Sequence, residues 1–360
     1  MTKPQSLFST AAFCVLCFAF TLAFQTNAWA GDTSTCVEND VELPPELEST
    51  NVERGSIRRA KTSSGTSISL GVSKVDCETA TKAFKAVWDE FDRVEKLTST
   101  KEEGTGLVLV NAAAGKEPVV VEKELFALVQ LSLDFARQSD GAFDPTFAAV
   151  YRLYDFRKEV VPDAKDLETA LANVDFRKVI LDESDHSIFL KETGMSLSLG
   201  GIKKGYAIDR SALILRELGV EHFIFRSPSE LTIIGEPGGG SRRVGVPALD
   251  GKSTLALLEV KDRSLNISRD LDASFEKDGV RYHHILDPST GVSAHHVRTV
   301  GLVSHDATSA DALSTAVFVL GPQRGMALVE RLRGVEAIVL DVENRLHISS
   351  GMQNVEVFSQ

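Results

Sequence analysis

The stretch Met195–Gly219, MSLSLGGIKKGYAIDRSALILRELG, decides how the rest of this chain is interpreted. Apolar residues alternate with serines from Met195 to Leu199, which predicts a half-buried strand. The strand runs into Gly200–Gly201, where two residues without a Cβ allow a tight turn. Apolar residues at helical spacing then predict a helix that ends at Gly219. The predicted order is strand, glycine turn, helix.

The N-terminus of that helix is a candidate anion site. Backbone N–H groups there are free and carry partial positive charge, and Lys203, Lys204 and Arg210 add full charges nearby. Phosphate is the anion that this arrangement fits best. An ordinary connection between a strand and a helix is the alternative, because glycine turns are common in such places.

The first residues have the features of an export signal. Lys3 precedes an apolar run over residues 7–24, and Ala28-Trp29-Ala30 is typical of a cleavage site. We therefore expect residues 1–30 to be a signal peptide and the protein to be exported to the periplasm. An uncleaved anchor in the inner membrane is the alternative, since the apolar run is close to the length of a membrane span.

The remaining chain divides into a polar leader over residues 31–55 and one large domain over residues 56–360. The formal net charge of −12 argues against nucleic acid as a partner and is compatible with metal binding. Export would leave only Cys36 and Cys77, so at most one disulfide forms and the fold does not depend on a disulfide framework.

Helical and strand periodicities are intermixed along this domain without a repeat, which indicates an α+β or α/β fold. Helices are predicted at residues 78–97, 125–137, 163–173, 309–320 and 323–333. Strands are predicted within 56–75 and at 119–121, 179–181, 188–190, 223–225, 231–234, 255–260, 264–267, 297–303, 336–340 and 346–349.

A pair of histidines supplies a candidate general base. His283 and His284 lead directly into the turn Asp287-Pro288-Ser289-Thr290-Gly291, so an imidazole would be held at a strand end beside a rigid loop. A general base needs such fixed placement and a pKa near neutrality. The alternative is that one histidine fills the strand and the other is solvated.

Asp311 and Thr315 form a candidate metal site. They stand four positions apart on a predicted helix, so the carboxylate and the hydroxyl lie on one face, one turn apart. Hard oxygen ligands of this kind suit Mg²⁺. Alternatively, Asp311 is an acid near a helix start that the helix dipole stabilises.

Four motifs in colinear order resemble the FAD:protein FMN transferases of the ApbE family, between about Gly65 and Gly351. They are Gly141–Thr146, Leu199–Arg210, His284–Gly291 and Ala310–Ala316. The resemblance implies an α+β fold in which mixed sheets pack with helices. It implies a T-fold-related single large domain of two subregions.

The resemblance also implies an activity, namely Mg²⁺-dependent transfer of FMN from FAD to a threonine or serine hydroxyl of an exported or membrane partner protein, with release of AMP. His284 would be the catalytic base. FAD would be bound by Ala142, Phe143, Asp144, Lys204, Arg210 and Leu286. Magnesium would be held by the backbone carbonyl of Ala207 and by Asp311 and Thr315, with Ser314 where many members have another ligand.

Several segments depart from the family pattern. Ser64-Gly65-Thr66 replaces Met-Gly-Thr, Thr100 replaces an aromatic residue, Ser198 replaces an acid, Arg226–Glu230 replaces Asn-Ala-Gly-Gly-Asp, and Ile267–Leu271 replaces Thr-Ser-Gly-Asp-Tyr. Two other functions therefore stay open. One is a catalytically silent flavin-binding homologue, favoured if Arg226 and Arg269 fill the pocket. The other is a Mg²⁺-dependent pyrophosphatase that splits FAD into FMN and AMP.

Overall fold

The computed structural model describes residues 56–63, 65–236, 242–248 and 253–358. The predicted signal peptide and leader lie outside these ranges. Both assignments, and the limits of the domain, stay predictions.

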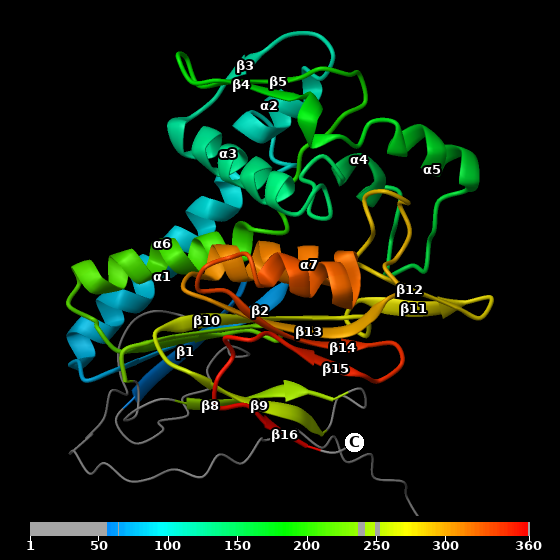
Figure 1. Cartoon of the computed structure of the whole chain (residues 1–360). Coiled ribbons are helices and arrows are strands. Elements are labelled where there is room, and N and C mark those ends of the chain that lie inside the picture. Colours follow the sequence, from blue (N-terminus) through cyan, green and yellow to red (C-terminus); the bar gives the residue numbers. More distant parts are fainter. Residues whose placement is uncertain (1–55, 64, 237–241, 249–252, 359–360) are drawn as a thin grey trace, which may run out of the picture.

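An antiparallel sheet of eight strands forms the base of the fold (Figure 1). Across the sheet the strands are β1 (Ser56–Ser63), β2 (Thr66–Ser73), β6 (Phe223–Arg226), β7 (Glu230–Ile234), β10 (Arg263–Arg269), β13 (Val297–Ser304), β14 (Glu336–Asp341) and β15 (Leu346–Ile348). The predicted hairpin near the start of the domain is confirmed as β1 and β2. β2 pairs with β6, although residues 74–222 separate the two strands along the chain.

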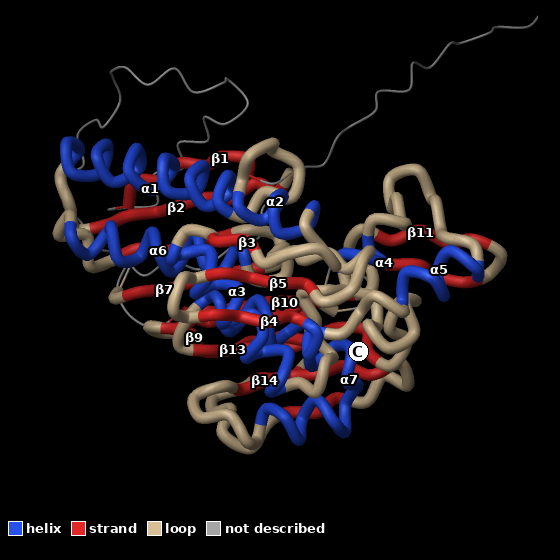
Figure 2. The backbone as a smooth tube through the Cα atoms, turned by 90° about the horizontal axis from the view of Figure 1, so that it is seen from above, coloured by secondary structure: helices blue, strands red, loops and turns tan. Residues whose placement is uncertain are grey.

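Three long helices cover one face of this sheet, as both views show (Figures 1 and 2). They are α1 (Cys77–Leu97), α6 (Lys203–Glu217) and α7 (Ala307–Val329). α6 and α7 approach closely at Gly205, because a Cβ there would lie only 2.2 Å from the carbonyl oxygen of Ala307. This contact brings the start of α6 against the start of α7.

The opposite face of the sheet packs on a smaller sheet of β8 (Arg242–Pro247), β9 (Thr254–Val260) and β16 (Glu356–Val357). Apolar side chains from both sheets form one core cluster there, including Ile233, Leu258 and Ile338. The large sheet is therefore covered on both faces.

A second group of elements lies above the three long helices (Figure 1). It contains α2 (Gly106–Ala112), α3 (Lys123–Gln138), α4 (Ala148–Tyr151), α5 (Ala164–Leu171), the 3₁₀ turn Phe176–Lys178, and a sheet of β3 (Val119–Val120), β5 (Ser187–Leu190) and β4 (Val179–Asp182). A separate hairpin, β11 (Ser274–Lys277) with β12 (Val280–His283), projects from one end of the large sheet. The predicted α+β class is confirmed.

The predicted strand at Met195–Leu199 is wrong, although its alternating burial is observed. The backbone of Leu197 bonds to the side chain of Asn111 through both its N–H (2.7 Å) and its C=O (3.0 Å), and Ser198 N donates to Pro145 O at 2.9 Å. A side chain and a loop thus supply the partners that a neighbouring strand would otherwise give. The predicted helix does follow, and it ends at Gly219 with a φ of 75°.

The two helices predicted near the C-terminus are joined end to end in α7. The break falls at Gly321, whose φ of 77° is left-handed, and Pro322 follows it. α7 is long and apolar enough to span a membrane, but 67% of that apolar window is buried inside the protein, as expected of a core helix. Sequence periodicity missed α2, α4, β8, β16 and the β11–β12 hairpin, all of them short.

Candidate active site

Asp311 lies at the centre of a buried polar cluster between α6, α7 and the large sheet. Its Oδ1 accepts a hydrogen bond from Asn266 Nδ2 of β10 at 3.0 Å. Its Oδ2 accepts from the backbone N–H of Gly205, in the first turn of α6, at 3.2 Å. The helix N-terminus that was predicted to attract an anion therefore holds the Asp311 carboxylate.

Lys204 links Asp311 to a second acid. Its Nζ lies 3.6 Å from Asp311 Oδ1 and 3.4 Å from Glu230 Oε2, and it donates to Ser229 Oγ at 3.0 Å. Burial alone would lower the pKa of Lys204, but the Asp311 and Glu230 carboxylates outweigh burial and raise it above its usual value. Lys204 is thus a half-buried ammonium group beside the candidate metal ligand.

Glu230, at the start of β7, was not among the predicted site residues. Its side chain is fully buried, and beyond the ion pair with Lys204 neither carboxylate oxygen has a hydrogen-bond partner. Burial raises the pKa of Glu230 to about 8, with Asp311 adding to the effect and Lys204 opposing it. The sequence signal was a lone acid that begins the otherwise apolar strand 231–234.

The other predicted magnesium ligands are hydroxyl and carbonyl oxygens that make hydrogen bonds within the protein. Ser314 Oγ donates to Asn266 Oδ1 at 3.1 Å, Thr315 Oγ1 contacts Asp311 O at 3.4 Å, and Ala207 O accepts from Ser211 Oγ at 2.7 Å. The described residues contain no cluster of three or more His, Cys, Asp or Glu side chains that could hold a metal. A hard cation such as Mg²⁺ fits this donor set because it accepts carboxylate, hydroxyl and carbonyl oxygens.

His284 has the geometry of a neutral general base. Its Nδ1 lies 2.8 Å from the carbonyl oxygen of Asp272. Because a carbonyl only accepts, Nδ1 carries the hydrogen and Nε2 keeps a free lone pair. Burial lowers the pKa of His284, and the charge of Lys204 lowers it further. His283, in contrast, is fully buried and fills the strand end.

The predicted flavin residues of the 141–146 loop are engaged within the protein. The Phe143 ring packs on the glycine turn, since a Cβ at Gly201 would lie 2.8 Å from it. Asp144 accepts from Thr146 N at 2.8 Å and from Phe176 N at 3.1 Å, so its carboxylate fixes this loop.

Ala142 and Leu286 are also buried, in two different apolar clusters. Direct contact of Ala142, Phe143, Asp144 and Leu286 with FAD stays a prediction.

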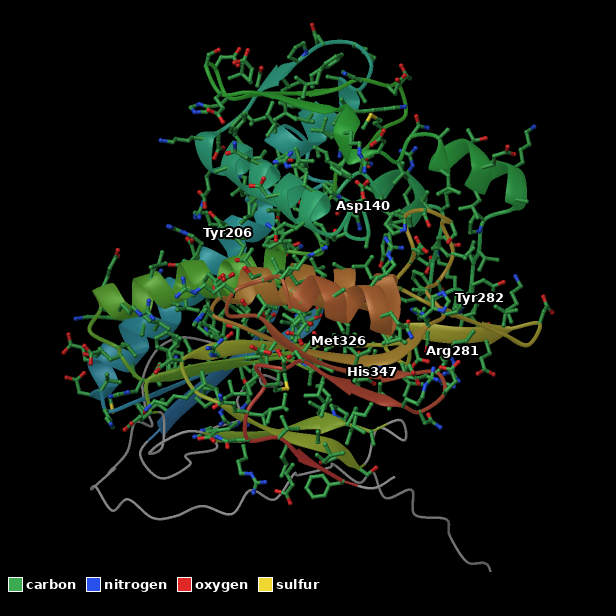
Figure 3. All side chains as sticks on the ribbon, viewed as in Figure 1. Asp140, Tyr206, Arg281, Tyr282, Met326 and His347 are labelled. Atoms are coloured by element: carbon green, nitrogen blue, oxygen red, sulfur yellow. The ribbon has the colours of Figure 1, made fainter. Side chains whose placement is uncertain are left out.

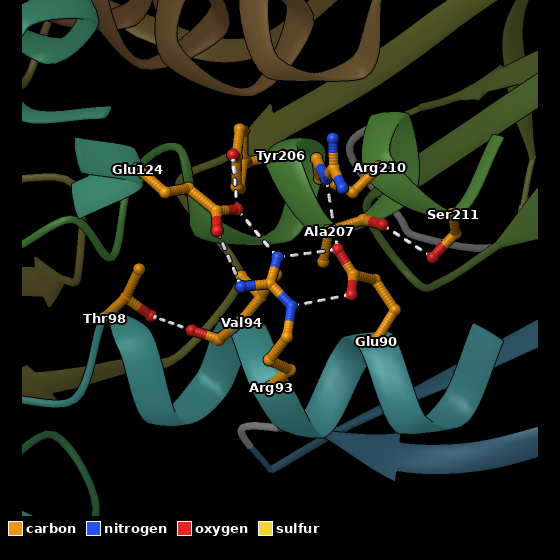
Figure 4. Close-up of polar contacts among 9 residues, drawn as sticks. All are labelled: Glu90, Arg93, Val94, Thr98, Glu124, Tyr206, Ala207, Arg210 and Ser211. Atoms are coloured by element: carbon orange, nitrogen blue, oxygen red, sulfur yellow. Dashed lines mark hydrogen bonds and ion pairs between the residues drawn. The ribbon is translucent and has the colours of Figure 1, made fainter. Parts of the chain in front are cut away.

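Arg210 is not brought to Lys204 and Asp311. Figure 4 shows it on the side of α6 that faces α1, where its Nε donates to Glu90 at 3.1 Å. Arg93 also binds Glu90, so Arg210 belongs to an ion-pair network between the two helices. Its predicted role in binding the nucleotide is untested.

Arg269, which could have filled the pocket, is paired within its own loop. Its Nη2 and Nε contact the carboxylate of Asp272 at 2.6 and 3.1 Å. This bidentate ion pair holds the residue whose carbonyl orients His284. Arg269 therefore supports the candidate base.

A half-buried lysine, a carboxylate suited to a cation and a histidine with a free ring nitrogen lie on one scaffold, a combination that suits a group-transfer enzyme. The ApbE family model matches residues 64–339. The chain belongs to the ApbE family, as the four sequence motifs predicted.

Curated relatives cover most of the chain. An FAD:protein FMN transferase of Treponema pallidum is 33% identical over 289 residues, covering 75% of this chain and 80% of the relative. One from Klebsiella pneumoniae is 30% identical, covering 79% and 89%. The structure of an ApbE protein from Thermotoga maritima matches with a TM-score of 0.75 at 29% identity, covering 82% of this chain and 97% of that chain.

Proposed function

We propose that this protein transfers FMN from FAD to a threonine or serine hydroxyl of a partner protein, with release of AMP and dependence on Mg²⁺. The observation that carries the proposal is the contact of Lys204 with Asp311 at the N-terminus of α6, which combines a cationic side chain suited to a phosphate with a carboxylate suited to Mg²⁺. The names of the relatives support the same activity.

The proposed reaction consists of one proton transfer to His284 and the exchange of one oxygen for another at the FMN phosphorus. His284 Nε2 takes the proton of the acceptor hydroxyl, whose oxygen then forms a bond to the FMN phosphorus. The bond between that phosphorus and the bridging oxygen breaks, and AMP leaves with the oxygen. Lys204 stabilises the negative charge that develops on the phosphate oxygens.

Asp311, Thr315, Ser314 and the carbonyl of Ala207 would hold the magnesium ion. When bound, the ion would neutralise the pyrophosphate and act as a Lewis acid. Lys204 contacts Asp311 in this structure. With magnesium on Asp311, the Lys204 ammonium would keep its contacts with the Glu230 carboxylate and the Ser229 hydroxyl.

We further propose that the acceptor is an exported protein, such as a periplasmic flavoprotein or a subunit of a redox complex in the membrane. The predicted signal at residues 1–30 supports this location. Cys77 is disulfide-bonded, and disulfides persist mainly in oxidising compartments. Nucleic acid is disfavoured as a partner by the net charge of −12.

The test is to incubate the purified protein with FAD, MgCl₂ and a threonine-containing peptide. We expect covalent flavin on the peptide by mass spectrometry, and AMP in equal amount by chromatography. Asp311→Ala should abolish Mg²⁺-dependent turnover, whereas Asp134→Ala, an exposed acid on α3, should retain it.

Two results would reject transfer. AMP without modified peptide would assign the protein as an FAD pyrophosphatase. Bound FAD without either product would assign it as a silent flavin-binding homologue.

A further inference from the structure

The starts of α6 and α7 are joined by two carboxylates that act in opposite directions. Asp311 of α7 accepts a hydrogen bond from the Gly205 N–H in the first turn of α6 at 3.2 Å. Asp209 of α6 accepts from the first two N–H groups of α7, those of Ala307 and Thr308, each at 2.8 Å. Each helix therefore supplies an acid to the N-terminus of the other.

Asp209 is bound to α7 through both of its carboxylate oxygens. Its Oδ1 accepts from Ala307 N, and its Oδ2 accepts from Thr308 N and also from Thr308 Oγ1 at 2.5 Å. The first N–H groups of a helix have no acceptor within the helix, so hydrogen bonds and the helix dipole both stabilise a carboxylate there. Three donors on two consecutive residues fix the direction and the distance of this contact.

Asp209 faces α7, whereas a neighbouring side chain of α6 faces another helix. Figure 3 shows Tyr206 between α6 and α3, where its hydroxyl donates to Glu124 at 2.7 Å. Asp209 stands one turn after Gly205, on the face of α6 where Gly205 leaves no room for a Cβ against α7. The Asp209 carboxylate therefore ties the two helices together where their backbones are in close contact.

The N-terminus of α7 also has a cap of its own. Asp306, the residue before the helix, accepts from Ser309 N at 2.7 Å. A carboxylate at this position is a common way to satisfy the first N–H groups of a helix. The contacts of Asp209 differ because they come from another helix. They cap α7 and, in addition, set its position along α6.

We propose that Asp209 is a positioning residue for the magnesium site, because it holds together the two helices that carry the metal ligands. This inference rests on the proposed function. The predicted ligands come from both helices, the carbonyl oxygen of Ala207 from α6 and the side chains of Asp311 and Thr315 from α7. Ala207 is two residues from Asp209, and Asp311 is three residues from Thr308. A shift of α7 along α6 changes the spacing of these oxygens.

Magnesium is sensitive to such a shift. It requires nearly octahedral geometry with ligand oxygens at about 2.0–2.1 Å, so small displacements of its ligands weaken binding. Residues that orient metal ligands typically contribute about 10- to 100-fold to metal affinity. Loss of the Asp209 contacts should therefore lower the affinity for Mg²⁺ in protein that is still folded.

Calorimetric titration of the full-length, FAD-free protein with MgCl₂ tests this role. Asp209→Asn puts an NH₂ group against an N–H donor of α7, and it should weaken Mg²⁺ binding by about tenfold. Asp306→Asn is the matched control, because it removes the same charge from the same end of α7. Asparagine caps a helix about as well as aspartate, so the Mg²⁺ affinity of the control should change by less than about twofold.

A second variant covers the case in which Asp209→Asn does not fold. Thr308→Val removes only the hydroxyl contact with Asp209 and leaves both N–H contacts in place. It should weaken Mg²⁺ binding in the same direction, by about threefold. If Asp209→Asn does not fold, unchanged Mg²⁺ affinity in Thr308→Val would overturn the proposal.

The dissociation constant separates positioning from a purely structural role. A structural role would lower the Tm of Asp209→Asn and the number of binding sites per chain, but it would leave the dissociation constant of the folded protein unchanged. That result would overturn the proposal. Equal weakening of Mg²⁺ binding in Asp306→Asn would overturn it in favour of a charge effect.

Neither FAD nor turnover is needed for this measurement, so its result is separable from the transferase activity. A wild-type protein that binds no Mg²⁺ would reject both the proposed Mg²⁺-dependent transfer and the role of Asp209. Wild-type Mg²⁺ binding that Asp209→Asn retains in full would reject the role of Asp209 alone. The expected loss of affinity in a protein without transfer activity would support the role of Asp209 and reject the proposed function.

Discussion

Replacing Glu230 by glutamine should weaken Mg²⁺ binding, although Glu230 is not a predicted metal ligand. A cation that binds Asp311 must displace Lys204, whose ammonium lies 3.6 Å from Asp311 Oδ1. Glu230 retains that ammonium at 3.4 Å and so stabilises the metal-bound state. In Glu230→Gln the lysine has only Asp311 as a charged partner and competes more strongly with the metal.

The size of the effect follows from these distances. With an effective dielectric constant of about 20, the 3.4 Å contact between Lys204 and Glu230 is worth about 5 kcal/mol before reorganisation. Desolvation and rearrangement offset much of this energy and leave about 1.5–3 kcal/mol. At about pH 9, where Glu230 is ionised, we therefore expect Mg²⁺ to bind about 10- to 100-fold more weakly in the variant.

Titration calorimetry with MgCl₂ on FAD-free protein measures this difference. Burial raises the pKa of Glu230 to about 8, so wild-type affinity should increase between about pH 7 and pH 9 as Glu230 ionises and draws Lys204 away from Asp311. The glutamine variant should lack this increase. Glu236→Gln, which changes an exposed acid paired with Lys261, is the control. Unchanged Mg²⁺ affinity in folded Glu230→Gln would refute the reasoning.

Three further predictions concern the base and the scaffold. His284→Ala should leave FAD affinity largely intact and slow transfer by about 10²- to 10⁴-fold, as single-turnover assays would show; unchanged transfer would exclude His284 as the base. Gly205→Ala should lower the free energy of unfolding by about 1–3 kcal/mol in denaturant titrations, because the new Cβ would lie 2.2 Å from Ala307 O. Gly200→Ala is the control and should lower it much less, since the nearest atom to its Cβ would be 3.4 Å away. Equal losses in the two variants would contradict this prediction. Asp341→Asn should lower Tm by roughly 5 °C at neutral pH. Burial would raise the pKa of Asp341, but hydrogen bonds from His347 and Arg345 outweigh it and lower the pKa, so this stability is present above the unfolded pKa of about 4 and is lost as pH falls through the lower folded value. A Tm difference that persisted at low pH would contradict that linkage.

The periodic parts of the fold could be predicted from the sequence. α1 has one continuous apolar face, and its helix was predicted almost to the residue. Met195–Leu199 shows the limit of such reasoning. Its alternating burial follows from local pattern, but its backbone partners are Asn111 and Pro145, whose proximity depends on tertiary packing. The β11–β12 hairpin was missed because each strand has only four residues, and the polar Glu276, Lys277 and Asp278 interrupt any apolar periodicity.

The candidate site was predictable where function depends on local spacing. Asp311 and His284 were identified because each stands in a motif of consecutive residues. Glu230 and Asn266 were missed because strands far apart in sequence bring them to Asp311. Arg210 was grouped with Lys204 by proximity in sequence, yet six residues along a helix place the two side chains on different faces.

The pairing of β2 with β6 has a consequence for the folding kinetics of the chain. The β1–β2 hairpin can form early because its contacts are local. The other edge of β2 pairs with β6, and this pairing can form only after residues 74–222, which include α1 to α6, have folded. Until then that edge is unpaired, with Leu70 and Val72 among its residues. Non-local pairing of this kind slows folding and leaves a strand edge on which other chains can add. Refolding yield should therefore fall steeply as protein concentration rises.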